Sequence, residues 1–137
     1  MNEKILADAL EFATTINPDR PQHWIELESG AAVPASMLDW GAYLHSPRRF
    51  RLQVIVPPQG RELSTVFLGF DHAFRGPPMI YETMIFPTVE SADGLECWRY
   101  ATRESAAVGH REILTALLST TDPDEQLKRA RALEVDP

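Results

Sequence analysis

The sequence contains a single cysteine and no long apolar run. Because Cys97 stands alone, the chain cannot close an internal disulfide or build a zinc knuckle from paired cysteines. No stretch approaches the roughly 20 apolar residues that a membrane-spanning helix requires, and the residues after Met1 lack the basic and apolar layout of a signal peptide. We therefore expect a cytosolic protein that folds by packing alone and has no membrane partner.

Positive charge is also scarce. The formal net charge is -7, from 13 Lys and Arg residues against 20 Asp and Glu residues. Proteins that bind phosphate backbones need clustered Lys and Arg, so no nucleic-acid partner is expected. The carboxylates are spread along the chain, which favours a solvated surface over an acidic decoy of nucleic acid.

The standard catalytic and cofactor motifs are missing as well. The sequence has no phosphate-binding glycine loop, no nucleophile-elbow serine, no histidine pair at zinc-protease spacing and no calcium loop. No cofactor is therefore expected. An active site assembled from residues far apart in sequence stays open, but the missing motifs favour a non-enzymatic protein.

The overall composition is that of an ordinary globular protein. Of the 137 residues, 44% are hydrophobic and 24% are charged, which favours a folded domain over a disordered chain. We expect a single domain over residues 1–137, with a core over 22–119 and terminal helices over 3–15 and 123–134.

Alternating apolar residues bounded by Gly and Pro predict a sheet. The predicted strands cover 24–28, 50–56, 62–70, 79–86 and 96–101. Helical spacing and capping residues predict further helices over 34–44 and 103–119. Short loops between successive strands favour an α+β fold, an antiparallel β-meander of four to five strands packed with helices.

The two central strands carry apolar residues on both faces. In 62–70, Val66 and Phe67 point to opposite sides, and in 79–86 the same holds for Met84 and Ile85. A sheet of this kind needs cover on each face, from helices or from a partner subunit. The pattern therefore predicts a homodimer.

Four polar residues could form a metal site. Asp71 and His72 follow one predicted strand, Glu82 lies within the next, and His110 lies in the long helix. His72, Glu82 and His110 could ligate a borderline cation while Asp71 orients an imidazole or activates water, as in a metal-dependent hydrolase. The spacing matches no recognised metal signature, so no metal is assigned.

A structural role explains the same residues more simply. His110 shares an apolar stripe with Leu114 and Leu117, which favours a packed, hydrogen-bonded core histidine. Gly109 beside it indicates a close approach of the helix to the sheet. Glu82 lies on an apolar strand face, where a partner would pair with it: Arg99, Arg51, Tyr100 or His110. Asp71 and His72 would order a turn through its backbone.

The loop after Asp71 has the composition of a protein contact. Phe74 and Arg75 stand beside Pro77 and Pro78, and aromatic and guanidinium side chains are enriched at interfaces. The candidate binding residues are Asp71, His72, Phe74, Arg75, Glu82, Thr83 and His110. Cys97, next to Trp98, is expected to be buried and inert.

Several stretches resemble a family of small uncharacterised proteins of bacteriophages and prophages in actinobacteria and proteobacteria. They are 64–72 (STVFLGFDH), 77–86 (PPMIYETMIF), 98–102 (WRYAT) and 109–110 (GH). The resemblance implies a phage or prophage accessory protein and places five residues in the family pattern: Asp71, His72, Glu82, Thr83 and His110. It implies no activity. Phe70 departs from the pattern, in which leucine is expected.

The sequence therefore favours a non-enzymatic protein-binding module that contacts a host or phage protein in the cytosol of the host cell. Two alternatives stay open. One is the metal-dependent hydrolase described above. The other is an acidic inhibitor of a host defence nuclease, which would require carboxylates gathered on one face.

Overall fold

The computed structural model describes residues 20–88 and 96–137, so the expected helix over 3–15 lies outside the described residues. The chain divides into two compact units. Met1–Arg49 with Leu68–Ile80 form the first, here called the hairpin unit, and Phe50–Phe67 with Tyr81–Pro137 form the second, the sheet unit. Among the described residues there is no helix with the length and apolar character needed to cross a membrane.

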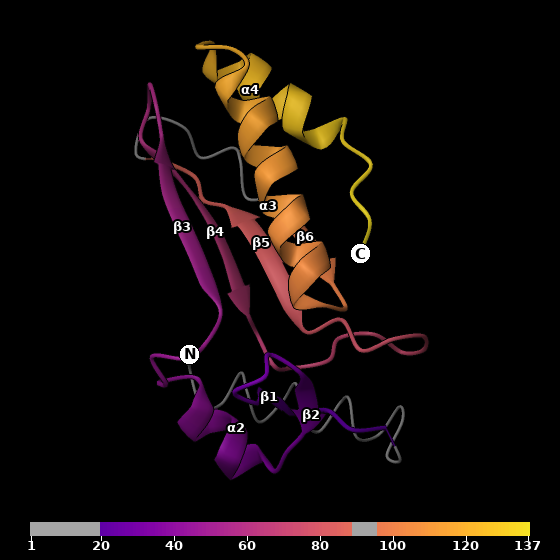
Figure 1. The fold of residues 1–137 in the computed structure, drawn as a ribbon. Coiled ribbons are helices and arrows are strands. Elements are labelled where there is room, and N and C mark those ends of the chain that lie inside the picture. The colour runs from indigo at the N-terminus through magenta and orange to yellow at the C-terminus, as the bar shows by residue number, and fades with distance from the viewer. Residues whose placement is uncertain (1–19, 89–95) are drawn as a thin grey trace. The chain divides into compact units, whose positions relative to one another are not determined.

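Among its described residues, the hairpin unit has two short strands and one helix (Figure 1). Strand β1 (Trp24–Glu26) pairs antiparallel with β2 (Ala32–Pro34). Helix α2 (Met37–Tyr43) follows, and the Ser36 side chain caps it by accepting a hydrogen bond from the Asp39 amide. The expected strand over 24–28 and helix over 34–44 are thus present in shorter form, whereas β2 was not predicted.

Aromatic residues pack the interior of this unit. Trp40 is buried, and its indole N–H donates to the Leu68 carbonyl at 2.9 Å. The rings of His23 and Phe70 lie 5.0 and 6.0 Å from the Trp40 ring, between centroids. Aromatic pairs at such distances add to the stability gained from burial. They tie the segment after residue 67 to α2 within one unit.

In the part of the sheet unit that the structure describes, there are four strands and two helices. Its strands are β3 (Arg51–Val56), β4 (Arg61–Phe67), β5 (Tyr81–Ile85) and β6 (Glu96–Tyr100), and its helices are α3 (Arg103–Leu118) and α4 (Pro123–Arg131). The strands lie in the order β3-β4-β5-β6 and each neighbouring pair is antiparallel. The predicted α+β fold with an antiparallel meander is confirmed.

Both helices of this unit begin where the sequence predicts. Thr102 caps α3 by accepting from the Ser105 amide, and Asp122 caps α4 by accepting from the Asp124 amide. Pro123 occupies the first turn of α4, where a missing amide proton costs nothing. Helix α4 ends at Arg131, slightly before the expected limit of 134.

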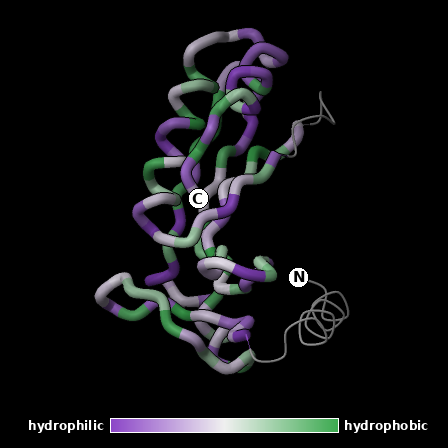
Figure 2. The backbone as a smooth tube through the Cα atoms, turned by 90° about the vertical axis from the view of Figure 1, so that its right-hand side faces the viewer, coloured by the Kyte–Doolittle hydropathy of each residue, from purple (hydrophilic) through white to green (hydrophobic). Residues whose placement is uncertain are grey.

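The helices cover one face of the four-stranded sheet (Figure 1). The core between them is formed by Val56, Leu63, Ile85, Ile113, Leu117, Leu127 and Ala130. Hydrophilic and hydrophobic residues both occur along the backbone of this unit (Figure 2). Because successive side chains of a strand point to opposite faces, the opposite face carries the alternate residues. We call it the open face, because none of the described helices of this unit packs on it.

The open face is mixed in character. It carries Arg51, Gln53, Ile55, Glu62, Ser64, Val66, Glu82, Met84, Cys97 and Arg99. Ile55 is 63% exposed, whereas Val66 and Met84 are half-buried. The apolar residues that suggested a second covered face are therefore interleaved with charged and polar ones.

Candidate functional site

A chain of hydrogen-bonded side chains runs between the sheet and α3. Thr65 on β4 and Thr83 on β5 are register partners, and their hydroxyl oxygens lie 2.6 Å apart. The Tyr100 hydroxyl on β6 donates to Thr83 Oγ1 at 3.0 Å. At the other end, Thr65 Oγ1 lies 2.8 Å from Nδ1 of His110 on α3.

Gly109 brings the helix close enough for this chain to form. A Cβ atom at position 109 would lie 2.4 Å from both Cε1 and the hydroxyl oxygen of Tyr100. Any side chain there would collide with the tyrosine that anchors the chain of hydroxyls. The predicted close approach of the helix to the sheet is confirmed, and its partner is Tyr100.

The hydrogen bonds favour a neutral His110. If Tyr100, Thr83 and Thr65 each donate in turn, the series ends with Nδ1 of His110 as the acceptor, and every hydroxyl proton is used. A proton on Nδ1 would leave one of the two threonine hydroxyls without an acceptor among these groups. Burial lowers the pKa of His110 and raises that of Tyr100, so both stay neutral near pH 7.

The burial of these four hydrogen-bonded side chains indicates a structural role. Thr65, Thr83 and Tyr100 have no exposed surface, and His110 is 7% exposed. Buried polar groups that satisfy one another fix one arrangement of the elements that carry them. Here they set the position of α3 on three strands. The hydrogen-bonded core role expected for His110 is what the geometry shows.

Glu82 forms a separate cluster on the open face. Its Oε2 accepts hydrogen bonds from Arg99 Nε at 3.2 Å and from Cys97 Sγ at 3.1 Å. Register explains the contact, because Glu82 lies opposite Arg99. Of the four partners considered from the sequence, Arg99 is the one that forms the ion pair. Its side chain remains 42% exposed, so the pair adds little stability.

The expected burial of Cys97 is wrong. The residue is exposed, because strand alternation that turns Trp98 and Tyr100 toward α3 turns Cys97 the other way. Its pKa is nevertheless raised to about 11, by desolvation of the sulfur first, then by the hydrogen bond to Glu82 and the charge of that carboxylate. The thiol therefore stays protonated at neutral pH, and a protonated thiol is a weak nucleophile.

In the hairpin unit, Asp71 organises the loop that follows it. Its Oδ1 accepts from the amides of Ala73 and Met79, at 2.9 and 3.1 Å, and its Oδ2 pairs with Nε of Arg20. Arg20 also donates from Nη2 to the carbonyl of Gly76 at 2.8 Å. One carboxylate and one guanidinium thus hold the beginning, the tip and the end of the loop over residues 71–79, here called the Asp71 loop.

The Asp71 loop exposes its apolar and cationic tip. Phe74 is 62% exposed and Arg75 is exposed beside it. Gly76 has a φ of 79°, a left-handed conformation that glycine adopts without strain. His72 is exposed as well, with its ring 4.9 Å from that of Phe70. Asp71 therefore orders the turn, while Phe74 and Arg75 face solvent.

The sequence candidates fall into different units. Asp71, His72, Phe74 and Arg75 belong to the hairpin unit, whereas Glu82, Thr83 and His110 belong to the sheet unit. Within residues 20–88 and 96–137, no group of three or more His, Cys, Asp or Glu side chains is placed to hold a metal ion.

Three residues that form these clusters were not among the candidate site residues predicted from the sequence: Arg20, Thr65 and Tyr100. Thr65 shares a strand face with Leu63 and Phe67, and a hydroxyl between two buried apolar residues is a detectable signal for a polar contact. Arg20 and Asp71 are far apart in sequence, so no local pattern could have paired them.

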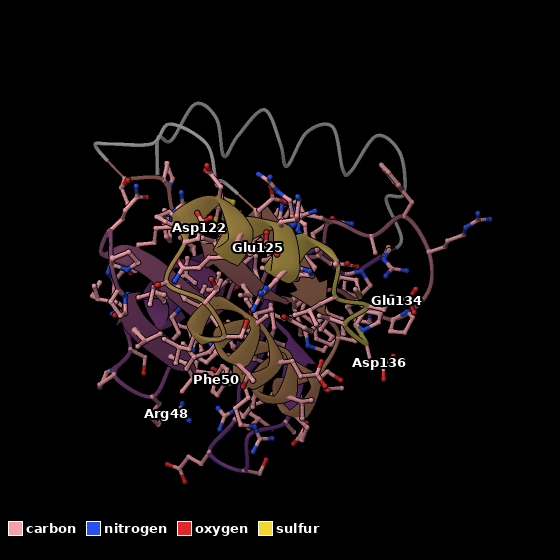
Figure 3. All side chains as sticks on the ribbon, turned by 90° about the horizontal axis from the view of Figure 1, so that it is seen from above. Arg48, Phe50, Asp122, Glu125, Glu134 and Asp136 are labelled. Atoms are coloured by element: carbon pink, nitrogen blue, oxygen red, sulfur yellow. The ribbon has the colours of Figure 1, made fainter. Side chains whose placement is uncertain are left out.

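A groove lies beside α3 on the outer side of the sheet unit. It has a volume of about 260 Å³ and is lined by Glu104, Ser105, Val108, Glu112, Glu134, Val135 and Asp136. Figure 3 shows Glu134 and Asp136 on the segment after α4. Four carboxylates therefore border one groove, a concentration that the sequence did not suggest.

Comparisons with known proteins gave no match. No protein-family model, no curated protein and no solved structure is similar to the chain at a significant level.

Proposed function

We propose that this chain is a non-enzymatic protein-binding module and that the Asp71 loop is its contact surface. The observation that carries the proposal is the combination of a braced loop base with an exposed Phe74 and Arg75 at the tip. The partner is a host or phage protein, and the place of action is the cytosol of the host cell, as the family resemblance suggests.

Bracing matters because ordering a loop on binding consumes binding free energy. An immobilised side chain or loop segment costs about 0.5–1.5 kcal/mol per rotamer-rich residue. In the Asp71 loop, the hydrogen bonds from Ala73 and Met79 to Asp71 hold the backbone in place before any partner arrives. Folding therefore already meets the cost of ordering the loop backbone, while the exposed Phe74 and Arg75 side chains are still to be ordered on binding.

The exposed side chains have the chemistry of binding anchors. An aromatic ring and a guanidinium are the types most often found at energetic centres of interfaces, where truncation costs about 2 kcal/mol or more. Phe74 supplies apolar area that water wets poorly, and Arg75 adds a charge that pairs with a carboxylate. An acidic rim around an apolar pocket is the matching surface on the partner.

A photo-crosslinking experiment tests the proposal. A benzophenone amino acid replaces Phe74 in one sample and Leu118 in a control, since Leu118 is also an exposed large apolar residue, at 55%. Irradiation in the host cell should give one discrete crosslinked protein from position 74 and none from position 118. Equal crosslinking from both positions, or none from position 74, contradicts the proposal.

Two variants assign the binding to the loop. Phe74→Ala with Arg75→Ala should weaken binding of the crosslinked partner by roughly thirtyfold or more, as loss of about 2 kcal/mol requires. Asp71→Asn keeps the tip but removes the charge that Arg20 pairs with, so it should weaken binding by a smaller factor. Unchanged affinity in the first variant excludes the tip as the contact.

A second candidate function rests on the carboxylate-lined groove. Glu104, Glu112, Glu134 and Asp136 meet the requirement that an acidic inhibitor of a host defence nuclease gather carboxylates on one face. Nuclease activity of a host extract on plasmid DNA should then fall when the protein is added, and the effect should weaken at high salt. Neutralising the four carboxylates to Gln and Asn should abolish it, while the Phe74 variant should not.

A further inference from the structure

Strand β3 is one edge of the sheet, and its outer backbone groups have no partner strand within residues 20–88 and 96–137. The Phe67 amide donates to the Phe50 carbonyl, which fixes the alternation of hydrogen bonds between β3 and β4. The even-numbered residues of β3 exchange bonds with β4, and the odd-numbered ones point their N–H and C=O groups away from it. These are Arg51, Gln53 and Ile55.

We infer that a second copy of this chain pairs with β3, edge to edge and antiparallel, so that two four-stranded sheets become one continuous sheet. The register with full overlap places Gln53 on the two-fold axis, opposite Gln53 of the other copy. Arg51 then lies opposite Ile55 of the other copy, and the three outward residues of each strand meet outward residues of its partner.

Charge complementarity favours this occupant. Within each copy, Ile55 lies opposite Glu62. Across the seam, the junction between the two β3 strands, Arg51 of one copy therefore faces Ile55 of the other, and Glu62 lies one strand beyond that Ile55. Two strand spacings, about 10 Å in all, separate the outer pair, and long Arg and Glu side chains span that distance. Because of the two-fold symmetry, this contact between Arg51 and Glu62 occurs twice in the dimer.

The two charges are available for that pairing. Arg51 is exposed and forms no ion pair with any other described residue. Glu62 uses Oε1 to accept from Gln53 Nε2 at 3.0 Å, which leaves Oε2 for a second donor. The stem of Arg51 would also cover Ile55, whose 63% exposure is high for a large apolar residue on a sheet.

The helix side of the seam is complementary too. In the same register, Leu52 of each copy lies opposite Val54 of the other, and both are half-buried at the edge of the core. A charged side chain on an edge strand ordinarily prevents pairing with other chains. Here the antiparallel register places Arg51 near Glu62 of the other copy and keeps it apart from Arg51 of the other copy.

The other edge is a poorer candidate. Strand β6 offers only Cys97 and Arg99 as outward residues within Glu96–Tyr100. The Arg99 guanidinium already pairs with Glu82 of its own copy. Self-pairing there would place Cys97 opposite Arg99, which gains neither a salt bridge nor an apolar contact.

A charge-swap series tests the seam by sedimentation of the full chain over a range of concentrations. Wild type should sediment as a dimer, and Arg51→Glu and Glu62→Arg should each raise the dissociation constant at least roughly tenfold by setting like charges together. The double variant, Arg51→Glu with Glu62→Arg, should restore dimerisation. Arg111→Glu, an equal change of charge at an exposed site on α3, should leave it unchanged.

The single cysteine provides an independent readout of which surfaces meet. With a nitroxide on Cys97, the edge-to-edge dimer places the two labels seven strand spacings apart, on the order of 30–35 Å. Pairing through β6, or face-to-face packing of the open faces about 10 Å apart, would bring them within about 20 Å. A monomer at all concentrations, a double variant that stays monomeric, or the shorter distance each overturns the inference.

Discussion

Each unit contains a buried polar cluster, and the two clusters are stabilised in different ways. In the hairpin unit, one charged carboxylate, Asp71, is satisfied by two backbone amides and by Arg20. In the sheet unit, four neutral side chains satisfy one another in series, from Tyr100 to His110. The charged cluster shapes a loop, whereas the neutral one positions a helix on a sheet.

The charged and the neutral cluster should differ in how much stability depends on any single group. A buried charge is costly to leave unpaired, so the loop around Asp71 depends on a single group. A series of neutral hydroxyls spreads the dependence over several weaker bonds, each worth about 1 kcal/mol. Removing one group should therefore affect the hairpin unit more than the sheet unit.

The largest effect is expected from Asp71→Ala. Its carboxylate has no exposed surface and its partner Arg20 is mostly buried, and removing one partner of such a pair costs about 3–5 kcal/mol. Chemical denaturation should show that loss, and proteolysis should cleave faster within 72–78. Asp136→Ala, at an exposed position, should change stability by less than about 0.5 kcal/mol. Equal effects of the two variants would remove the contrast between the units.

Two glycines should respond with opposite signs. Gly109→Ala forces a Cβ against Tyr100, and overpacking of this kind costs about 1–3 kcal/mol. Gly41→Ala in α2 meets no atom within 4 Å and should stabilise by up to about 1 kcal/mol through helix propensity. Thermal denaturation of both variants compares them. A stabilising Gly109→Ala would show that α3 can withdraw from the sheet without penalty.

A loss of similar size is expected from Thr83→Val, which keeps the shape but removes the central hydroxyl. Tyr100 then loses its acceptor and Thr65 one of its partners, at a cost of about 1–3 kcal/mol. Adding Tyr100→Phe to Thr83→Val should recover part of that loss, because it removes the unsatisfied group. Additive losses in this double-mutant cycle would mean that the two hydroxyls act independently.

The smallest effect is a pH dependence with one contribution from each unit. Burial lowers the folded-state pKa of His110 and of His23. The unfolded chain therefore binds more protons, and the free energy of unfolding should fall as pH drops through about 6.5, the ordinary pKa of histidine. His110→Gln and His23→Gln should each flatten that fall. An unchanged slope in both buried variants contradicts the assignment.

Local patterns predicted most elements because each rests on short-range chemistry. Alternation found β3 to β6, and capping residues such as Thr102 and Asp122 fixed the helix starts. Strand β2 was missed because three residues that end in Pro34 give no periodicity. The exposure of Cys97 was within reach, since alternation with Trp98 already turned it outward.

The candidate site was predictable only in part. His110 and Glu82 stood out as polar residues on apolar faces, and both proved to be hydrogen-bonded. The sequence did not predict the hydrogen bonds that Thr65 and Tyr100 form, because the partner of a strand hydroxyl depends on which residue of the neighbouring strand lies opposite it. The register that sets Thr65 against Thr83 follows from how the strands align.

By itself, the sequence determined the kinds of element, their order and the faces that alternate along them, because backbone propensity and apolar periodicity act over a few residues. Only the tertiary structure decided which polar groups meet: Arg20 with Asp71, and Tyr100 through two threonines with His110. Such partners are far apart along the chain, and their pairing is fixed by the packing that removes water from between them.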